Sequence, residues 1–230
     1  MADASEPRLL EPRRRRILYA MGIDYWVRRD LPASPCAVAD SVEARQPPPR
    51  AFTPAVAPGW EQLQQAVSSC SRCELSHSRR HTVFGTGDQS ARVMVIGEAP
   101  GEEEDRQGIP FVGRAGGLLN QMLLAAGLSR ETVYIANILK CRPPGNRNPS
   151  PQEAQACHDY LQQQIRLLQP QVILAVGGVS AANLLQTDRS VGSLRGRIHH
   201  YGASGIPLVV TYHPSYLLRR PAEKAKTWDD

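Results

Sequence analysis

Four short apolar runs, rich in β-branched residues, recur along the C-terminal part of this chain. They occupy residues 92–97 (RVMVIG), 133–139 (VYIANIL), 172–177 (VILAVG) and 208–212 (LVVTY). Runs that are apolar at nearly every position are typical of strands that are covered on both faces, as in a parallel sheet. This feature constrains the fold most, because parallel strands must be joined by long crossovers, which are usually helices.

Helical segments lie between these runs. Residues 115–126 end at Gly127, a typical C-cap, and residues 178–185 form another apolar helix. Residues 150–153 (SPQE) combine a capping box with proline at the first helical position, so we expect a helix that runs to about Leu168. The alternation predicts an α/β fold, a three-layer α/β/α sandwich with a central, mainly parallel four-stranded sheet. Ligands of such sheets bind beyond the carboxyl ends of the strands.

The first 58 residues have a different character. Residues 31–58 contain seven prolines, which favours a linker because proline donates no backbone hydrogen bond to a sheet. Residues 17–27 (ILYAMGIDYWV) have the pattern of a short amphipathic helix, which could dock onto the main domain or bind a partner. We therefore predict an N-terminal extension over residues 1–58 and a folded domain over residues 59–230.

Charge and hydropathy narrow the possible classes of function. The net charge of +5 permits binding to nucleic acid without requiring it. No apolar stretch approaches the ~20 residues that a membrane-spanning helix needs, and no long apolar segment follows the arginine run at residues 13–16. We therefore expect no membrane association and no secretion, and a cytoplasmic protein whose cysteines are reduced.

Four of the five cysteines form two pairs. Cys70 and Cys73 make a C-x-x-C motif, and Cys141 and Cys157 lie farther along the chain. Four thiolates can close a tetrahedral zinc site or hold a [4Fe–4S] cluster, and the spacing alone leaves both open. Cys141 and Cys157 could also be small buried side chains without a metal. Cys36, in the proline-rich segment, is predicted to be a free thiol.

Three further segments carry a resemblance to a known family. They are residues 97–105 (GEAPGEEED), 108–116 (GIPFVGRAG) and 213–219 (HPSYLLR). With the four cysteines, they resemble the family 4 uracil-DNA glycosylases, the iron–sulfur members of the uracil-DNA glycosylase superfamily, over about residues 60–220. The resemblance implies a monofunctional enzyme of base-excision repair, which hydrolyses the N-glycosidic bond of a flipped-out deoxyuridine and leaves an abasic site.

The resemblance also implies a cofactor and a base-binding site. A structural [4Fe–4S] cluster would be held by Cys70, Cys73, Cys141 and Cys157. Phe111 would stack on the base, and His213 would donate a hydrogen bond to uracil O2 as negative charge develops. Asn137 lies inside an otherwise apolar strand, where an amide needs partners. We expect this amide to pair with uracil N3–H and O4, which cytosine cannot match.

The segment after the first run is acidic. In the best-known uracil-DNA glycosylases, an aspartate that orients water stands at the position that Ala99 occupies here. We therefore predict that Glu98 orients water or offsets positive charge on the sugar. By resemblance, Glu104 also lines the pocket, where it would orient water instead or exclude the methyl group of thymine.

The last motif is predicted to contact DNA. Leu217 resembles the wedge residue that enters the base stack in this superfamily, and Ser215 and Arg219 would contact the DNA backbone. Further backbone-contact candidates are Arg220, Arg142, Arg147 and Lys140.

Two other classes of protein remain open. Ala99 is compatible with a superfamily member that binds damaged DNA with weak or no turnover, and the cysteines alone are compatible with a redox or zinc protein on an α/β scaffold. For the favoured function, we expect a monomer whose partner is DNA that contains uracil. The N-terminal extension is predicted to bind a repair protein, and the chain would associate with the nucleoid in a bacterium.

Overall fold

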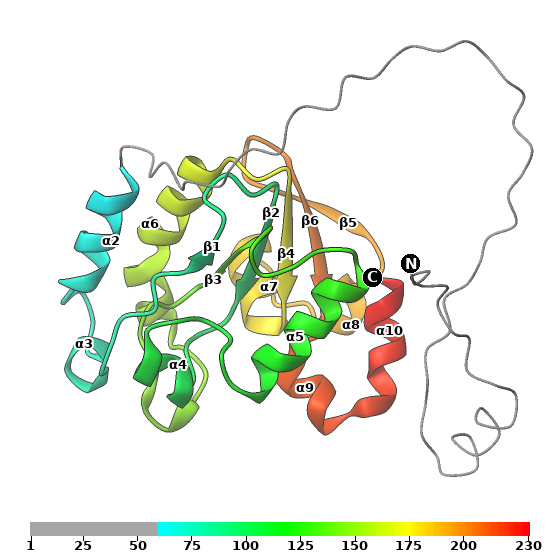
Figure 1. Cartoon of the computed structure of the whole chain (residues 1–230), viewed down its shortest axis with the longest axis horizontal. Coiled ribbons are helices and arrows are strands. Elements are labelled where there is room, and N and C mark those ends of the chain that lie inside the picture. The colour runs from blue at the N-terminus through cyan, green and yellow to red at the C-terminus, as the bar shows by residue number, and fades with distance from the viewer. Residues whose placement is uncertain (1–58) are drawn as a thin grey trace, which may run out of the picture. The chain divides into compact units, whose positions relative to one another are not determined.

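The computed structural model describes residues 59–230, which contain a six-stranded sheet with the order β1-β3-β2-β4-β6-β5 (Figure 1). The four central strands are parallel: β3 (Tyr134–Asn137), β2 (Val93–Gly97), β4 (Val172–Val176) and β6 (Ile206–Thr211). These strands are the four apolar runs of the sequence. The predicted α/β sandwich with a mainly parallel sheet is therefore confirmed.

The predicted number of four strands was wrong, because an antiparallel strand lies at each edge of the sheet. β1 (Thr86–Gly87) pairs with β3, and β5 (Ile198–Tyr201) pairs with β6. β1 has only two residues, and β5 has the sequence IHHY with alternating exposed and half-buried side chains. Neither segment is an apolar run, because an edge strand is not covered on both faces.

The helices alternate with the strands along the chain. They are α2 (Trp60–Ser68), α3 (Leu75–Ser78), α4 (Glu102–Gln107), α5 (Arg114–Ala125), α6 (Pro151–Leu168), α7 (Gly178–Leu185), α8 (Val191–Leu194), α9 (Pro214–Arg219) and α10 (Lys224–Asp229), with 3-10 turns at Pro144–Asn146 and Pro221–Glu223. The three predicted helices are α5, α6 and α7. The capping box of α6 is also confirmed, because the backbone N–H of Glu153 donates to the Ser150 hydroxyl and the Ser150 N–H donates to the Glu153 carboxylate.

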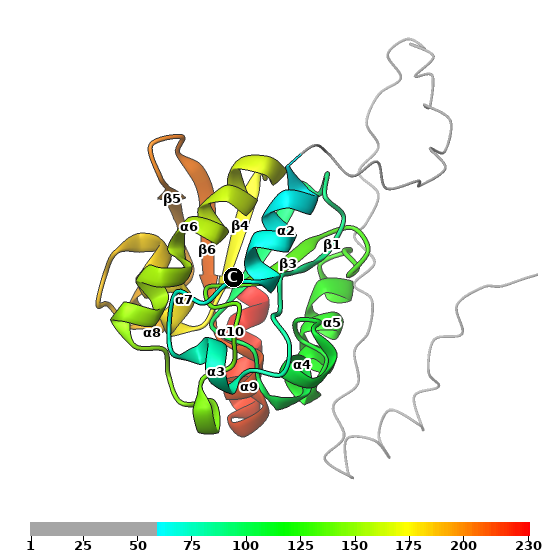
Figure 2. The same cartoon turned by 90° about the vertical axis from the view of Figure 1, so that its left-hand side faces the viewer.

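Apolar side chains cover both faces of the sheet. On one face, Met94 and Ile96 pack in a core with α2, α6 and α7, and Figure 2 shows α2 and α6 side by side. On the other face, Val95 and Ile135 pack against Leu119 of α5. Because successive residues of a strand point to opposite faces, burial of both faces requires the continuous apolar runs.

The carboxyl ends of the four parallel strands all lie at the same end of the sheet. The segments that follow β2 and β6 lead there into α4 and α9 (Figure 1). Pairing of β2 with β3 continues past the strand ends, since the N–H of Ile138 donates to the carbonyl of Gly97 and the N–H of Leu139 donates to that of Glu98. The carboxyl-terminal end of the sheet therefore brings together the motif segments that follow β2 and β6.

No helix within residues 59–230 is long and apolar enough to cross a membrane. The predicted extension over residues 1–58, with its amphipathic helix at residues 17–27, lies outside the described residues. The boundary between the two parts stays a prediction.

Candidate active site and cysteine cluster

Two of the predicted base-binding side chains lie against the last residue of β2, and a third lies beside one of them. A Cβ atom added to Gly97 would lie 2.4 Å from Asn137 Oδ1 and 2.6 Å from Phe111 Cζ, so both side chains lie directly against this glycine. The Phe111 ring also lies 5.7 Å from the His213 ring, centroid to centroid, with an angle of 32° between their planes. Phe111, Asn137 and His213 are therefore parts of one site.

The Asn137 side chain has an unused acceptor. The residue is 2% exposed, and its Oδ1 atom has no hydrogen-bond partner within the described part of the chain. A buried polar atom without a partner costs about 1–3 kcal/mol, so it needs a physical reason. An acceptor at the end of a strand, beside an aromatic ring, can bind a planar ligand that supplies an N–H group.

His213 presents a neutral imidazole. The residue is the N-cap of α9, and its Nδ1 accepts the backbone N–H of Ser215 at 3.1 Å, with the Ser215 hydroxyl 2.7 Å away. Burial and, to a smaller extent, the charge of Arg219 lower the pKa of His213 to about 4, although Glu104 opposes the shift. Since Nδ1 carries the lone pair, the proton of the neutral ring is on Nε2, which is then a hydrogen-bond donor.

Glu98 follows β2 directly and is half-buried. Burial raises the pKa of its carboxyl group. The next residue, Ala99, packs against the apolar cluster of Leu75, Leu139 and the cysteines Cys141 and Cys157. The turn after β2 thus separates the base-binding site from the cysteines, with Ala99 on the cysteine side.

Backbone N–H groups occupy both oxygens of the Glu104 carboxylate. Oε1 accepts from Val112 at 2.9 Å and from Gly113 at 3.0 Å, and Oε2 accepts from Gly101 at 3.1 Å. The sequence indicated a contact between Glu104 and the substrate, and that contact stays a prediction. These bonds show that the carboxylate also organises the loop that carries Phe111.

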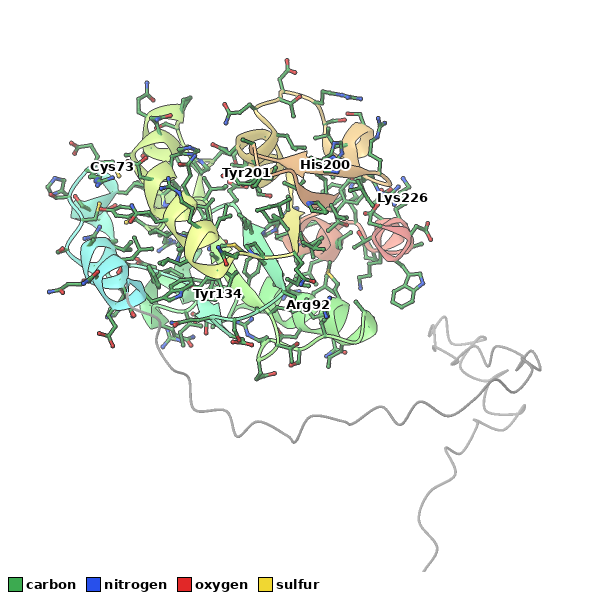
Figure 3. All side chains as sticks on the ribbon, turned by 90° about the horizontal axis from the view of Figure 1, so that it is seen from above. Cys73, Arg92, Tyr134, His200, Tyr201 and Lys226 are labelled. Atoms are coloured by element: carbon green, nitrogen blue, oxygen red, sulfur yellow. The ribbon has the colours of Figure 1, made fainter. Side chains whose placement is uncertain are left out.

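The four predicted ligand cysteines lie in three segments that meet beside α6. Cys70 and Cys73 lie between α2 and α3, Cys141 follows β3, and Cys157 is on α6. Figure 3 shows Cys73 at the α2 end of the molecule. All four are free thiols, with Cys141 and Cys157 buried and the other two half-buried. Cys73 packs with the buried pair.

Basic groups complement these thiols. Arg79 connects two of the segments, because its guanidinium donates to Cys141 Sγ at 3.2 Å and to the Cys70 carbonyl at 2.7 Å. Burial raises the pKa of Cys157 to about 11, while a hydrogen bond from the backbone of Lys140 opposes this shift. Burial also raises the pKa of Cys141, and Cys73 and Cys70 add to the shift. Their mutual influence shows that the thiols lie within electrostatic range of one another.

The sequence leaves two metal groups open for these four thiols, a zinc ion and a [4Fe–4S] cluster. Within residues 59–230, no three His, Cys, Asp or Glu side chains are grouped closely enough to hold a single metal ion. A zinc site requires four sulfurs at about 2.3 Å from one ion. A [4Fe–4S] cluster binds each thiolate to a different corner of a larger body, so its ligands stand farther apart. The four free thiols, with an N–H of Arg79 directed at Cys141 Sγ, are a donor set of the kind that holds such a cluster.

Comparisons with known proteins agree with this arrangement. Residues 84–230 match the family model of the Uracil DNA glycosylase superfamily. The type-4 uracil-DNA glycosylase of Thermotoga maritima is 41% identical over 72% of this chain and 86% of its own length. The type-4 enzymes of Pyrobaculum aerophilum and Saccharolobus solfataricus are 39% and 42% identical, over 74% and 69% of this chain and 90% and 77% of their own lengths.

The chain belongs to the uracil DNA glycosylase superfamily. The relatives named above place it with the type-4 enzymes. The sequence-based prediction of a DNA glycosylase is therefore confirmed, and the cysteine-only redox or zinc protein is not supported.

Two residues that the sequence assigned to DNA contact are buried in this glycosylase. Leu217 is 1% exposed, so it would enter a base stack only if α9 moves, and its role as the wedge stays a prediction. The following residue, Leu218, is half-buried on the same helix, and Arg219 is exposed as predicted for a contact with DNA. Lys140 is also 1% exposed, and its ammonium group donates to the Asn137 carbonyl at 2.8 Å and to Gln164 Oε1 at 2.6 Å.

Two of the other basic candidates have local partners. Arg147 forms two bonds of 2.8 and 2.6 Å with Glu153, and Arg142 donates to Asn146 at 2.7 Å. The structure also adds two functional candidates that the sequence did not indicate, Arg79 beside the cysteines and Arg130 beside Phe111. Neither lies in a recognisable motif, because each acts on groups that are distant along the chain.

Proposed function

We propose that this chain removes uracil from DNA by enclosing a flipped-out deoxyuridine among Phe111, Asn137 and His213. The observation that carries the proposal is the proximity of these side chains: Asn137 and Phe111 lie directly against Gly97, and the Phe111 ring lies 5.7 Å from the ring of His213. A side chain at Gly97 would meet both neighbours, so glycine is what lets the amide and the ring lie this close together at the strand end. Stacking on an aromatic ring contributes about 1–3 kcal/mol per base, which helps to offset the cost of flipping.

Asn137 selects uracil through its unused acceptor. Its Oδ1 atom receives the N3–H of uracil, and its NH₂ group donates to O4. Cytosine has an acceptor at N3 and an amino donor at C4. Its N3 would face the Asn137 Oδ1 acceptor and its amino group would face the Asn137 NH₂ donor, so these buried atoms would stay unpaired. A site of this kind rejects the wrong ligand far more strongly than an apolar pocket does.

His213 stabilises the leaving group. When the bond between uracil N1 and C1′ breaks, its electron pair stays on the base, and the negative charge spreads to O2. The neutral imidazole donates its Nε2–H to O2, and the Ser215 N–H holds the ring by its other nitrogen. A donor that is fixed before the reaction needs no reorganisation as the charge develops.

Glu98 acts on the sugar side. The carboxylate offsets the positive charge that develops at C1′ and orients the water whose oxygen forms the new bond to C1′. The water proton passes to the carboxylate and from there to the uracil anion, so the products are an abasic site, neutral uracil and the regenerated carboxylate. Because the base has largely departed before water attacks, a strong base at the position of Ala99 is not required.

Cys70, Cys73, Cys141 and Cys157 would hold a [4Fe–4S] cluster with a structural role. When bound, the cluster supplies four metal–thiolate bonds that join the segment before α3, the segment after β3 and α6. These bonds would fix both ends of the loop from Arg142 to Asn148, and the proposed reaction requires no electron transfer. Arg79 supports the same connection through its bonds to Cys141 and Cys70.

The wider setting follows from this activity. The substrate is DNA that contains uracil, which Ser215 and Arg219 contact through the backbone. The chain would act in the cytoplasm as a monomer, on the nucleoid in a bacterium. Residues 1–58 would recruit a repair protein.

The test uses an end-labelled oligonucleotide with a single deoxyuridine. Incubation with the protein, followed by hot alkali, should break the strand at the uracil and leave a cytosine-containing control intact. The Asn137→Ala variant should release at most a few per cent as much uracil in the same time. Binding to the oligonucleotide without strand breakage would favour the damage-binding protein that Ala99 leaves open.

A further inference from the structure

The loop before α5 holds Phe111 in a backbone conformation that bulky residues rarely adopt. The φ angle of Phe111 is +53°, in the left-handed region. Such a conformation is unfavourable for a residue with a large side chain, and it persists only where neighbouring groups determine it. In this conformation the ring lies against Gly97 and 5.7 Å from the His213 ring, and the residue is 6% exposed.

Two opposite charges hold the peptide group that follows Phe111. Its N–H, which belongs to Val112, donates to Glu104 Oε1 at 2.9 Å. Its carbonyl oxygen, which belongs to Phe111, accepts from Arg130 Nη1 at 2.9 Å. Because the N–H and C=O of one peptide group point in opposite directions, these two bonds fix the rotation of the peptide about its neighbours.

Arg130 also holds the preceding peptide and is itself fixed. Its Nη2 donates to the Pro110 carbonyl at 2.7 Å, and its Nη1 lies 3.2 Å from Asn120 Oδ1 on α5. On the same side, a Cβ atom on Gly116 would lie 1.8 Å from the Phe111 oxygen, so only glycine allows α5 to approach this closely. The guanidinium is half-buried, and burial lowers the pKa of Arg130, while the carboxylates of Glu131 and then Glu104 oppose this shift.

We infer that Arg130 is a positioning residue, which fixes the peptide group after Phe111 and thereby the direction of the ring that stacks on the base. This inference rests on the proposed function, in which Phe111 is the surface that receives the base. Arg130 contacts no substrate in this arrangement. It lies between α5 and β3, well outside the motifs, and only its two bonds to adjacent carbonyls connect it with the pocket.

The test is a double-mutant cycle between Arg130 and Phe111. Arg130→Gln, Arg130→Lys, Phe111→Ala and the two double variants are prepared from the full chain, and single-turnover excision is measured on a single-stranded deoxyuridine oligonucleotide. Arg92→Gln is the matched control, because Arg92 is an exposed arginine at the start of β2, bonded to Gln171 (Figure 3). Thermal unfolding of every variant reports stability separately from rate.

Arg130→Gln should lower the excision rate about tenfold or more, since a small displacement of a positioned group has effects of this size. Arg130→Lys keeps the charge and one donor, so its rate should be intermediate, and Arg92→Gln should react as the wild type does. In the Phe111→Ala background, both Arg130 substitutions should change the rate less than twofold, because the ring through which Arg130 acts is gone.

Three results would contradict the inference. A wild-type rate for Arg130→Gln would overturn it directly. Equal rate losses with and without the Phe111 ring would reduce Arg130 to a general structural role and overturn the inference alone. A wild-type rate for Phe111→Ala would remove the base-stacking surface from the proposed function, and the inference with it. If Arg130→Gln does not fold, Arg130→Lys in both backgrounds makes the same comparison.

Discussion

The ring of Phe111 and the imidazole of His213 lie 5.7 Å apart, although one follows β2 and the other follows β6. Both positions lie beyond the carboxyl ends of parallel strands, where an α/β sheet gathers groups that are distant along the chain. The fold thus places an aromatic surface beside a neutral donor: Phe111 lies against Gly97 at the end of β2, and His213 lies against Gly177, which follows β4.

Loss of the imidazole should slow base release without loss of the fold. His213→Ala should lower the single-turnover excision rate by a factor of ~10²–10³, a typical effect of removing a donor to a developing anion. His200→Ala is a suitable control, because His200 is an exposed histidine on β5 (Figure 3) and should retain the wild-type rate. A loss smaller than threefold for His213→Ala would remove this residue from the mechanism.

The buried imidazole should also make stability depend on pH. The pKa of His213 is lowered from 6.5 to about 4, so between these values the unfolded chain binds a proton that the folded chain does not. The contribution of this group to stability is therefore complete above pH 6.5 and is lost as the pH falls toward 4. Between pH 7 and pH 5, the loss amounts to about 2 kcal/mol in the free energy of unfolding.

Urea unfolding of the wild type and of His213→Gln at both pH values measures this contribution. The wild type should lose about 2 kcal/mol more than the variant on going to pH 5. Equal losses in the two proteins would show that the imidazole is not held neutral by burial.

A methyl group at the end of β2 should close the base-binding site. Gly97→Ala would place a Cβ atom 2.4 Å from Asn137 Oδ1 and 2.6 Å from the Phe111 ring, so both side chains must move. We expect the excision rate to fall ~10²-fold, in line with displaced reacting groups. Gly117→Ala is the matched control, because a Cβ atom there meets nothing within 4 Å; it should retain the rate and add about 0.5–1 kcal/mol of stability to α5.

Sequence reasoning predicted the elements whose pattern is local. The four central strands are continuous apolar runs, and the capping box of Ser150 and Glu153 predicts where α6 begins. The edge strands β1 and β5 were not predicted, because a strand that is exposed at a sheet edge needs no apolar run. Phe111 and His213 were found through the family resemblance and Asn137 as an amide inside an apolar strand, and the structure brings them together.

Contacts between distant segments could not be predicted in this way. Nothing near Arg130 in the sequence indicates that its partners are the carbonyls of Pro110 and Phe111. Burial of Leu217 and Lys140 depends likewise on which side of a helix or loop faces the core. A leucine in a DNA-contact motif and a lysine beside a basic loop give the same sequence signal whether they are buried or exposed.

Substitution of a cluster ligand should separate folding from chemistry. Cys70→Ser removes one of the four thiols, so the purified protein should lose the broad absorbance near about 400 nm that is typical of a [4Fe–4S] group, and its unfolding temperature should fall. Cys36→Ser, in the proline-rich segment, should retain both properties. A colourless wild-type protein of normal stability would contradict the proposed cluster.

Substitution of two adjacent leucines on α9 should affect different properties, stability for one and excision from double-stranded DNA for the other. Leu217 is 1% exposed, so Leu217→Ala should lower the free energy of unfolding by about 2–5 kcal/mol. Any change in its excision rate should be the same on single-stranded and double-stranded DNA. Leu218 is half-buried and can reach a base stack, where an apolar wedge offsets the unstacking cost. Leu218→Ala should therefore slow excision from double-stranded DNA at least fivefold more than from single-stranded DNA. Equal slowing on both substrates would exclude Leu218 as the wedge, and a selective defect in Leu217→Ala would show that α9 moves when DNA binds.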